Sequence, residues 1–278
     1  VYQSFRLLGL HRPACAVSFG GYAAGPGGLA ARLRGIPLLV HEQNRIPGMT
    51  NRVLARIARR VLQAFPGTWE ERLQPVSCGN PVRKSVAELP GPSLRMAGRE
   101  DAIRVLVTGG RQGALALNRL VPAAVSLVPE RALETRHQAG KGRKEDTLEA
   151  YRAAGVDAEV SEFIEDMAAA FGWADIVICR AGALTVSEIA AAGVAAVLVP
   201  SPFAVDDLQT RNAEFLVEAG AAVLLPEAAI SPESLAETLE TLTTKRETLL
   251  SMAEKGRSLA VPDSAARVAD LCMEYLAA

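Results

Sequence analysis

The stretch Asp175-Ile-Val-Ile-Cys-Arg-Ala-Gly-Ala-Leu-Thr-Val-Ser-Glu188 joins an apolar run to a glycine and then to a helical pattern. Residues 175–179 have the nearly continuous apolar character of a strand buried on both faces, which is typical of parallel sheets. The helical pattern that follows covers residues 183–192. A strand, a glycine turn and a helix in this order predict a βα unit of a doubly wound sheet, in which ligands bind at the carboxyl ends of the strands.

The same alternation continues on both sides of this unit. A second helix is expected at residues 115–128, and further strands are expected at residues 103–108, 134–138, 158–161, 195–199 and 221–225. Three closing segments have helical apolar spacing with no strand between them, at residues 232–243, 246–259 and 265–276. The pattern predicts one parallel sheet with helices on both faces, and the closing helices are expected to pack across that domain.

The first part of the chain predicts a second α/β unit. Helices are expected at residues 1–10 and 49–58, and strands at residues 14–18, 38–42, 61–65 and 76–78. The proline- and glycine-containing stretch 88–100 breaks both periodicities and is interpreted as a linker. We therefore expect an N-terminal domain at 1–90, a linker at 91–102 and a C-terminal domain at 103–278. Because the chain opens on a helix without an obvious domain start, the N-terminal domain is expected to be incomplete.

Composition narrows the classes of function. The 278 residues are 49% hydrophobic and carry a net charge of −1, which favours two folded domains and argues against a nucleic-acid partner. The four cysteines are widely spaced, with no CxxC pair and no histidine cluster, so buried thiols are expected and no metal or other cofactor. No apolar run is long enough to span a membrane and no signal peptide is evident, so a cytoplasmic protein is expected.

Four polar or glycine-rich segments follow predicted strands, at residues 20–28, 41–44, 109–114 and 180–188. The N-terminus of the helix near Ala183 could hold a diphosphate, and Glu188 could accept hydrogen bonds from ribose hydroxyls. The alternatives are plain turns for the loops and, for Glu188, a solvated glutamate that favours the helix dipole. Segment 109–114 lacks the GxGxxG spacing and the P-loop Lys-Ser/Thr, which argues against NAD and ATP.

These segments resemble the MurG family of glycosyltransferases in wording and in order, from about residue 13 to the C-terminus. The motifs that carry the resemblance are GGYxxGPGG at 20–28, HEQN at 41–44, QAFP at 63–66, GNPVR at 79–83, GGxxGA at 109–114, FIEDM at 163–167, CRAGALTVSE at 179–188 and QTRNA at 209–213. The resemblance implies a GT-B fold, in which two Rossmann-like domains have parallel sheets facing a cleft.

The resemblance also implies an activity and its partners. It is inverting, metal-independent transfer of N-acetylglucosamine from UDP-N-acetylglucosamine to the C4 hydroxyl of undecaprenyl-pyrophosphoryl-N-acetylmuramoyl pentapeptide, giving lipid II. The expected location is the inner face of the plasma membrane, with anionic lipid and other cell-wall synthesis proteins as candidate partners. Donor contacts are implied at Asn44, Arg83, Arg111, Ile164, Ala183, Leu184, Thr185, Val186, Ser187, Glu188 and Gln209. Acceptor-side residues are implied at Gly20, Gly21, Tyr22, His41, Glu42 and Gln43.

The chain departs from the family pattern at three places. The family's first glycine-rich loop, which supplies the histidine proposed as general base, has no counterpart, so no catalytic residue is assigned and His41 remains an acceptor-site candidate. Arg111 stands where the family usually has serine, and Phe203 and Leu208 stand where relatives often have histidine. Alternative interpretations are another enzyme of the GT-B fold, such as a UDP-sugar epimerase or a transferase for soluble acceptors, and a non-catalytic nucleotide-sugar binder.

Overall fold

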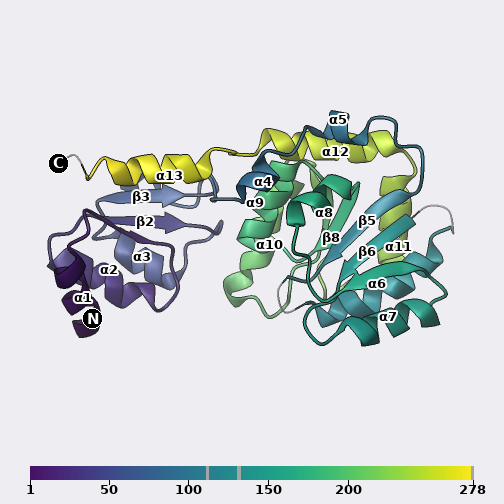
Figure 1. The fold of residues 1–278 in the computed structure, drawn as a ribbon, viewed down its shortest axis with the longest axis horizontal. Coiled ribbons are helices and arrows are strands. Elements are labelled where there is room, and N and C mark those ends of the chain that lie inside the picture. Colours follow the sequence, from purple (N-terminus) through teal and green to yellow (C-terminus); the bar gives the residue numbers. More distant parts are fainter. Residues whose placement is uncertain (111–112, 130–132, 277–278) are drawn as a thin grey trace. The chain divides into compact units, whose positions relative to one another are not determined.

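The computed structural model describes residues 1–110, 113–129 and 133–276. They form two compact units: unit 1 comprises Val1–Val82 with Val261–Ala278, and unit 2 comprises Arg83–Ala260. Both units are built on parallel sheets, as the sequence predicts, and Figure 1 shows the elements of each. The division differs from the expected boundaries at two places, because residues 83–90 belong to unit 2 and the last helix belongs to unit 1.

Unit 1 contains a four-stranded parallel sheet in the order β1-β2-β3-β4. Its strands are β1 (Ala16–Ser18), β2 (Leu38–Glu42), β3 (Arg60–Gln63) and β4 (Val76–Ser77). Its helices are α1 (Tyr2–His11), α2 (Ala24–Leu33), α3 (Met49–Ala55), the 3₁₀ helix η1 (Glu71–Leu73) and α13 (Ser264–Met273).

The side chains of β2 alternate between two cores. Leu38 and Val40 pack with Leu54 of α3, whereas Leu39 packs with Val268 of α13. Successive side chains of a strand point to opposite faces, so the sheet needs a cover on each face. Helix α13 supplies the second cover, which explains why it lies in unit 1 rather than with the other closing helices (Figure 1).

Unit 2 contains a six-stranded parallel sheet in the order β10-β9-β8-β5-β6-β7. Its strands are β5 (Ile103–Thr108), β6 (Leu133–Gln138), β7 (Ala158–Ser161), β8 (Ile176–Cys179), β9 (Ala195–Leu198) and β10 (Ala222–Leu224). Its helices are α4 (Lys84–Ala87), α5 (Pro92–Met96), α6 (Leu115–Leu127), α7 (Lys144–Ala153), α8 (Met167–Trp173), α9 (Ala183–Ala192), the 3₁₀ helix η2 (Val205–Asp207), α10 (Leu208–Val217), α11 (Pro232–Thr243) and α12 (Arg246–Ser258).

The strand order of unit 2 reverses between β5 and β8. β5 pairs with β6 on one side and with β8 on the other, and the chain runs outward in both directions. Val105 and Val107 of β5 pack with Leu117 of α6 and Leu239 of α11 on one face, and Leu106, between them, is fully buried toward the other. Ligands of doubly wound sheets bind outside the carboxyl ends of the strands at such a reversal, so the functional residues are sought there.

The expected linker is ordered on unit 2. Pro92 begins α5, a position where its missing N–H costs nothing. Arg95 donates to the carbonyl oxygens of Phe171, Ala192 and Gly193, at distances of 3.0, 2.7 and 2.5 Å. The stretch therefore holds the C-terminal ends of α8 and α9 in place. Its irregular sequence does not reveal this role.

Candidate functional site

Two cavities open at the carboxyl edge of the unit 2 sheet. The turn that follows β5 borders both, and it is named here the glycine-rich turn after Gly109, Gly110 and Gly113. The first, here named the Glu188 pocket, has a volume of about 760 Å³, and Gly110 lines it. The second, here named the Gln209 pocket, has a volume of about 800 Å³ and is lined by Gly109 and Gly113. The turn thus stands between two spaces, each large enough for part of a nucleotide sugar.

The Glu188 pocket brings together four of the residues implied as donor contacts, Arg83, Ile164, Thr185 and Glu188. The side chain of Glu188 on α9 is only 12% exposed, and its carboxylate lies 3.4 Å from Nε of Arg83. Burial raises the pKa of Glu188, and the Arg83 guanidinium opposes that rise. A largely buried carboxylate that lines an open cavity beside a cation can accept hydrogen bonds from a polyhydroxyl ligand.

The first turn of α9 leaves its backbone donors available. Gly182 precedes the helix, and no side chain forms a capping hydrogen bond there. Ala183 and Thr185 are half-buried, and Leu184 is exposed, so the backbone N–H groups of this turn can reach an anion. Val186 is fully buried, and Ser187 donates to the carbonyl oxygen of Ala183 at 2.9 Å. The side chains of the last two residues therefore serve the helix and its core.

Gln138 and Lys141 also line the Glu188 pocket, although the sequence analysis did not single them out. Gln138 ends β6 and donates to the carbonyl oxygen of Gly110 at 3.2 Å. The signal that could have found them is the sequence Gln138-Ala139-Gly140-Lys141, which places two polar residues and a glycine at the carboxyl end of a predicted strand.

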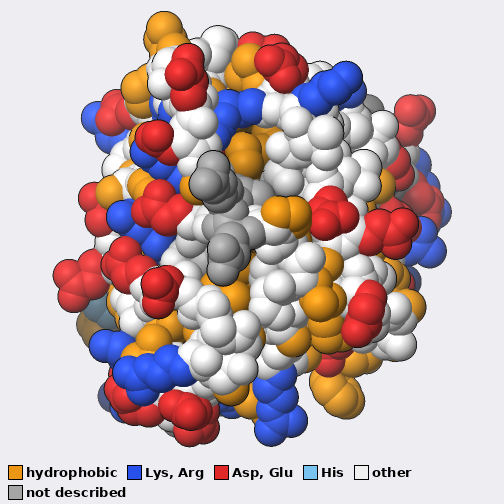
Figure 2. Space-filling model, turned by 90° about the vertical axis from the view of Figure 1, so that its right-hand side faces the viewer, with side chains coloured by type: hydrophobic (Ala, Val, Ile, Leu, Met, Phe, Trp, Pro, Cys, Tyr) orange, Lys and Arg blue, Asp and Glu red, His pale blue; other side chains and the backbone are white. Residues whose placement is uncertain are grey.

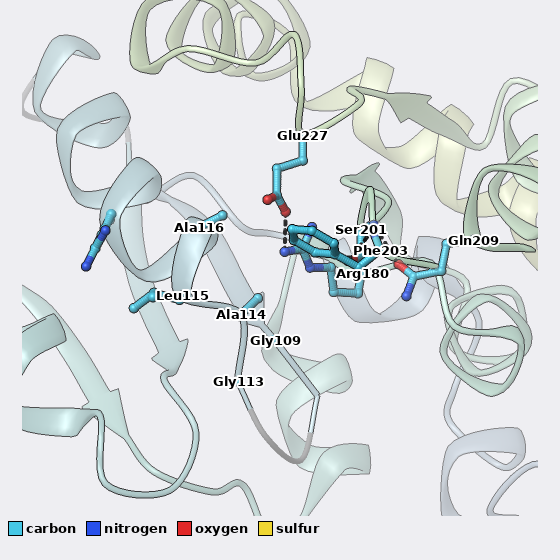
Figure 3. Close-up of a pocket in the computed structure, with 11 residues that line it drawn as sticks. Gly109, Gly113, Ala114, Leu115, Ala116, Arg180, Ser201, Phe203, Gln209 and Glu227 are labelled. Carbon is cyan, nitrogen blue, oxygen red and sulfur yellow. Dashed lines mark hydrogen bonds and ion pairs between the residues drawn. The ribbon is translucent and has the colours of Figure 1, made fainter. Parts of the chain in front are cut away.

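The Gln209 pocket is drawn in Figure 3. The Oε1 atom of Gln209 accepts a hydrogen bond from the backbone N–H of Ser201 at 2.9 Å, so its Nε2 donors are directed away from that bond. Arg180 forms an ion pair with Glu227 and donates to the carbonyl oxygen of Val199 at 3.0 Å. The pocket therefore offers both the amide donors of Gln209 and a neutralised ion pair.

Close backbone contact fixes the end of the glycine-rich turn. Gly110 and Gly113 have φ values of +75° and +71°, which disfavour side chains. A Cβ atom on Gly113 would lie 2.0 Å from the carbonyl oxygen of Ala139. The turn therefore lies in close contact with Ala139, the residue that follows β6. Arg111 lies outside the described residues.

The implied acceptor-side residues belong to unit 1, and two of them are buried. His41 is fully buried, where its Nε2 lies 2.9 Å from the carbonyl oxygen of Gly79, to which it donates. Its ring packs against Phe19, with centroids 5.2 Å apart, and burial lowers its pKa. This differs from the expectation that His41 faces an acceptor, because the end of β2 points it into the core.

Glu42 holds the loop that follows it. Its carboxylate accepts hydrogen bonds from the N–H of Asn44 at 3.0 Å, the N–H of Gly48 at 3.1 Å and Nδ2 of Asn51 at 2.9 Å. Asn44 also donates its Nδ2 to Glu42 at 3.1 Å. In this structure Glu42 shapes the loop rather than facing solvent.

The remaining acceptor-side residues are more accessible. Gln43 is half-buried, and its carbonyl oxygen accepts a hydrogen bond from Asn80 at 3.0 Å. Gly20 and Gly21 have φ values of +86° and +79°, and Tyr22 is 93% exposed. The glycines form a turn that other residues would strain, and the tyrosine ring projects from it.

Within the described ranges, no group of three or more histidine, cysteine, aspartate or glutamate side chains could hold a metal ion. No helix in the same ranges is both long and apolar enough to cross a membrane. Figure 2 shows acidic and basic side chains interspersed over one face, without a large area of a single sign. Because the net charge of the chain is −1, we expect an anionic ligand to be held by local groups, such as Arg83 and the first turn of α9.

Models of two protein families match the chain. The glycosyltransferase family 28 N-terminal domain matches residues 1–63, and the glycosyltransferase family 28 C-terminal domain matches residues 104–268. Among curated proteins, the UDP-N-acetylglucosamine--N-acetylmuramyl-(pentapeptide) pyrophosphoryl-undecaprenol N-acetylglucosamine transferase of Aeromonas hydrophila is 54% identical, over 98% of this chain and 74% of that protein. The transferase of the same name from Marinobacter nauticus is 53% identical, over 95% of this chain and 73% of that protein.

Solved structures agree with the sequence comparisons. The crystal structure of Acinetobacter baumannii MurG superposes with a TM-score of 0.87 and 41% identity, covering 98% of this chain and 77% of that one. A putative UDP-N-acetylglucosamine 2-epimerase from Listeria monocytogenes has a TM-score of 0.69 at 15% identity, over 96% and 75% of the two chains, which shows a shared fold alone. The resemblance and the GT-B fold class expected from the sequence are confirmed, and the chain belongs to the MurG family within glycosyltransferase family 28.

Proposed function

We propose that this protein transfers N-acetylglucosamine from UDP-N-acetylglucosamine to lipid I, with inversion, to give lipid II. The observation that carries the proposal is the Glu188 pocket, where a buried carboxylate, an arginine and the uncapped start of α9 meet at the strand reversal of the sheet. Family membership supplies the substrate class, since the relatives named above carry this transfer in their names.

The pocket residues have distinct roles in this proposal. Glu188 accepts hydrogen bonds from the ribose hydroxyls, and Ile164 lies along the uracil. The N–H groups of residues 183–185 and the Arg83 guanidinium stabilise the diphosphate as negative charge develops on the leaving UDP. Gln209 donates from Nε2 to an oxygen of the sugar. This division uses fixed donors and one cation for the developing charge, so no step depends on a metal.

The general base is left unassigned. His41 is fully buried, its Nε2–H already donates to Gly79, and its lowered pKa keeps the ring neutral. A base must reach the proton that it removes, so His41 is proposed as a residue that positions the end of β2.

The acceptor's polyprenyl chain makes membrane contact part of the proposal. Tyr2, Leu7 and Leu10 of α1 are 80%, 55% and 75% exposed, and Arg6 and Arg12 are their neighbours in the sequence. Apolar and basic groups on one short helix favour the surface of an anionic membrane. We propose peripheral binding at the cytoplasmic face, where other cell-wall synthesis proteins are candidate partners.

The direct test follows labelled sugar from UDP-N-acetylglucosamine to a short-chain lipid I analogue, with product identified by mass. Formation of the β-linked disaccharide supports the proposal. UDP binding without any product would instead identify a nucleotide-sugar binder, and release of UDP with an altered free sugar would identify epimerase-type chemistry. Glu188→Gln serves as the matched variant, because it keeps the shape of the side chain and removes its charge.

A further inference from the structure

A buried chain of polar side chains lies behind the glycine-rich turn of unit 2. The ring of His137 is 1% exposed and joins two partners, with its Nδ1 2.9 Å from Tyr151 Oη and its Nε2 3.1 Å from Oδ1 of Asn118. Asn118 then donates from Nδ2 to the carbonyl oxygen of Ala139 at 2.9 Å. The chain runs from α7 through β6 to α6, and it ends on the carbonyl against which Gly113 is pressed.

The donors and acceptors of this chain can be assigned in only one way. Because Asn118 uses its Nδ2 to donate to Ala139, its Oδ1 is an acceptor, and Nε2 of His137 must carry the proton. The Nδ1 atom is then an acceptor for the Tyr151 hydroxyl. Burial lowers the pKa of His137 to about 3, so the ring is neutral and keeps this single tautomer at neutral pH. The direction of each bond fixes the orientation of the Asn118 amide.

β6 holds the turn from both faces of the sheet. His137 and Gln138 are adjacent, so their side chains point to opposite faces. On one face Gln138 donates to the carbonyl oxygen of Gly110, and on the other Asn118 fixes Ala139 beneath Gly113. Because Gly110 lines the Glu188 pocket and Gly113 lines the Gln209 pocket, any shift of the turn changes both cavities.

We propose that Asn118 and His137 are positioning residues. They hold Gly110 and Gly113 of the glycine-rich turn in the positions that binding of a nucleoside diphosphate requires. The proposal rests on the function proposed above, because it assumes that the UDP part of the donor occupies the pockets beside the turn. Neither side chain lines either pocket, so both act through the backbone of Gly110, Gly113 and Ala139. Tyr151 belongs to the same chain but stands at its far end, three hydrogen bonds away from Ala139.

The position of Tyr151 provides a matched control. Asn118→Leu removes the bond to Ala139, whereas Tyr151→Phe removes only the bond to His137 and leaves the contacts of Asn118 intact. Both changes leave a buried polar atom without a partner, so both are expected to lower thermal stability. Only Asn118→Leu is expected to weaken UDP binding, by about tenfold, which is the loss typical of one misplaced hydrogen-bond donor.

The experiment measures the dissociation constant of UDP by calorimetry for the parent chain and each variant, together with the melting temperature. His137→Leu and His137→Gln form a second pair, since glutamine can still donate to Oδ1 of Asn118. We expect His137→Leu to bind UDP weakly and His137→Gln to restore binding. In His137→Leu, KM for the donor is expected to rise by a larger factor than kcat falls. If Asn118→Leu does not fold, this pair decides the question.

Two outcomes would overturn the proposal. If UDP affinity falls in proportion to the melting temperature in both Tyr151→Phe and Asn118→Leu, the chain of hydrogen bonds only stabilises unit 2. Unchanged UDP affinity in both leucine variants would mean that the turn does not depend on them. A parent chain that fails to bind UDP would instead contradict the proposed function itself, and that result is read before any variant is compared.

Discussion

Nε of Arg83 and the carboxylate of Glu188 lie 3.4 Å apart in the pocket proposed for the donor nucleoside. The arginine is 56% exposed and the glutamate only 12%, so the pair has one solvated and one buried member. Burial raises the pKa of the carboxylate, and the Arg83 guanidinium offsets part of that rise. Occupation of the pocket by ribose hydroxyls would have to be compatible with this contact.

Replacing Glu188 tests the ribose contact directly. Glu188→Ala is expected to weaken UDP binding by about 1–3 kcal/mol, the range for losing a charged hydrogen-bond partner. Glu165→Gln is the control, since Glu165 lines the same pocket but is exposed. Calorimetry measures both. Equal affinity in Glu188→Ala and the parent would show that the ribose contact lies elsewhere.

Removing Arg83 is expected to change the pH dependence of UDP binding. The pKa of Glu188 is already raised by burial and is held down by Arg83, so Arg83→Ala raises it further. The ionised carboxylate is lost as pH falls through its pKa, and a higher pKa means that this loss begins at higher pH. The acid limb of the affinity profile therefore moves upward in pH. Arg83→Lys retains the charge and is expected to leave the limb close to its original position; an unmoved limb in Arg83→Ala would contradict the pairing.

Asp175 is expected to be a stability centre of unit 2. Its fully buried carboxylate lies 2.5 Å from Arg99 and 2.6 Å from Arg246, and it also accepts from the N–H of Arg104 at 3.0 Å. Asp175→Asn removes the charge that both arginines face, so the free energy of unfolding is expected to fall by about 3 kcal/mol or more. Urea denaturation measures this change. Lys84→Gln, in the exposed pair with Glu88, is expected to change stability little, and a similar effect of both substitutions would refute the assignment.

Burial of neutral His41 predicts that unit 1 loses stability in acid. The folded-state pKa of His41 is lowered, so the unfolded chain binds the proton more readily. The stabilisation is present above the ordinary histidine pKa of about 6.5 and is lost as pH falls below it. His41→Gln can still donate to Gly79 but cannot be protonated, so its unfolding free energy is expected to decline less between about pH 7.5 and pH 5. Parallel declines in parent and variant would show that His41 is not the group responsible.

Membrane binding through α1 is tested with vesicles. The parent chain is expected to sediment with anionic vesicles at low salt, and less with neutral vesicles or at high salt. Leu7→Ser with Leu10→Ser removes exposed apolar area from α1 and is expected to reduce binding. Leu94→Ser removes a leucine of similar exposure, 76%, from α5 and serves as the control. Binding that ignores lipid charge and salt would exclude the proposed mode.

The sequence predicted the sheets well because their signals are local. Continuous apolar runs such as residues 176–179 and 195–198 are typical of strands covered on both faces, and the structure buries both completely. The glycine-rich turn was recognised for the same reason, because positive φ values require glycine at 110 and 113.

The placement of α13 and of His41 could not be predicted in the same way. Apolar spacing shows that residues 264–273 have one buried face, but it does not say which of the two sheets that face covers. His41 and Glu42 form a polar run after an apolar strand, which is typical of a binding loop. Only their hydrogen bonds with Gly79 and Asn51 show that these side chains are internal.

The return of α13 to unit 1 has a consequence for synthesis on the ribosome. Leu39 and Leu62 are translated before unit 2, but their partner Val268 follows more than two hundred residues later in the sequence. The close approach of Gly79 to Val261 and the bond from Ser264 to the carbonyl of Asn80, at 2.5 Å, must also wait until unit 2 has been translated. Unit 2 is therefore translated in full before unit 1 can be completed. One face of the unit 1 sheet must therefore remain uncovered until α13 has been translated, so this sheet gains its second cover only after unit 2 has been made.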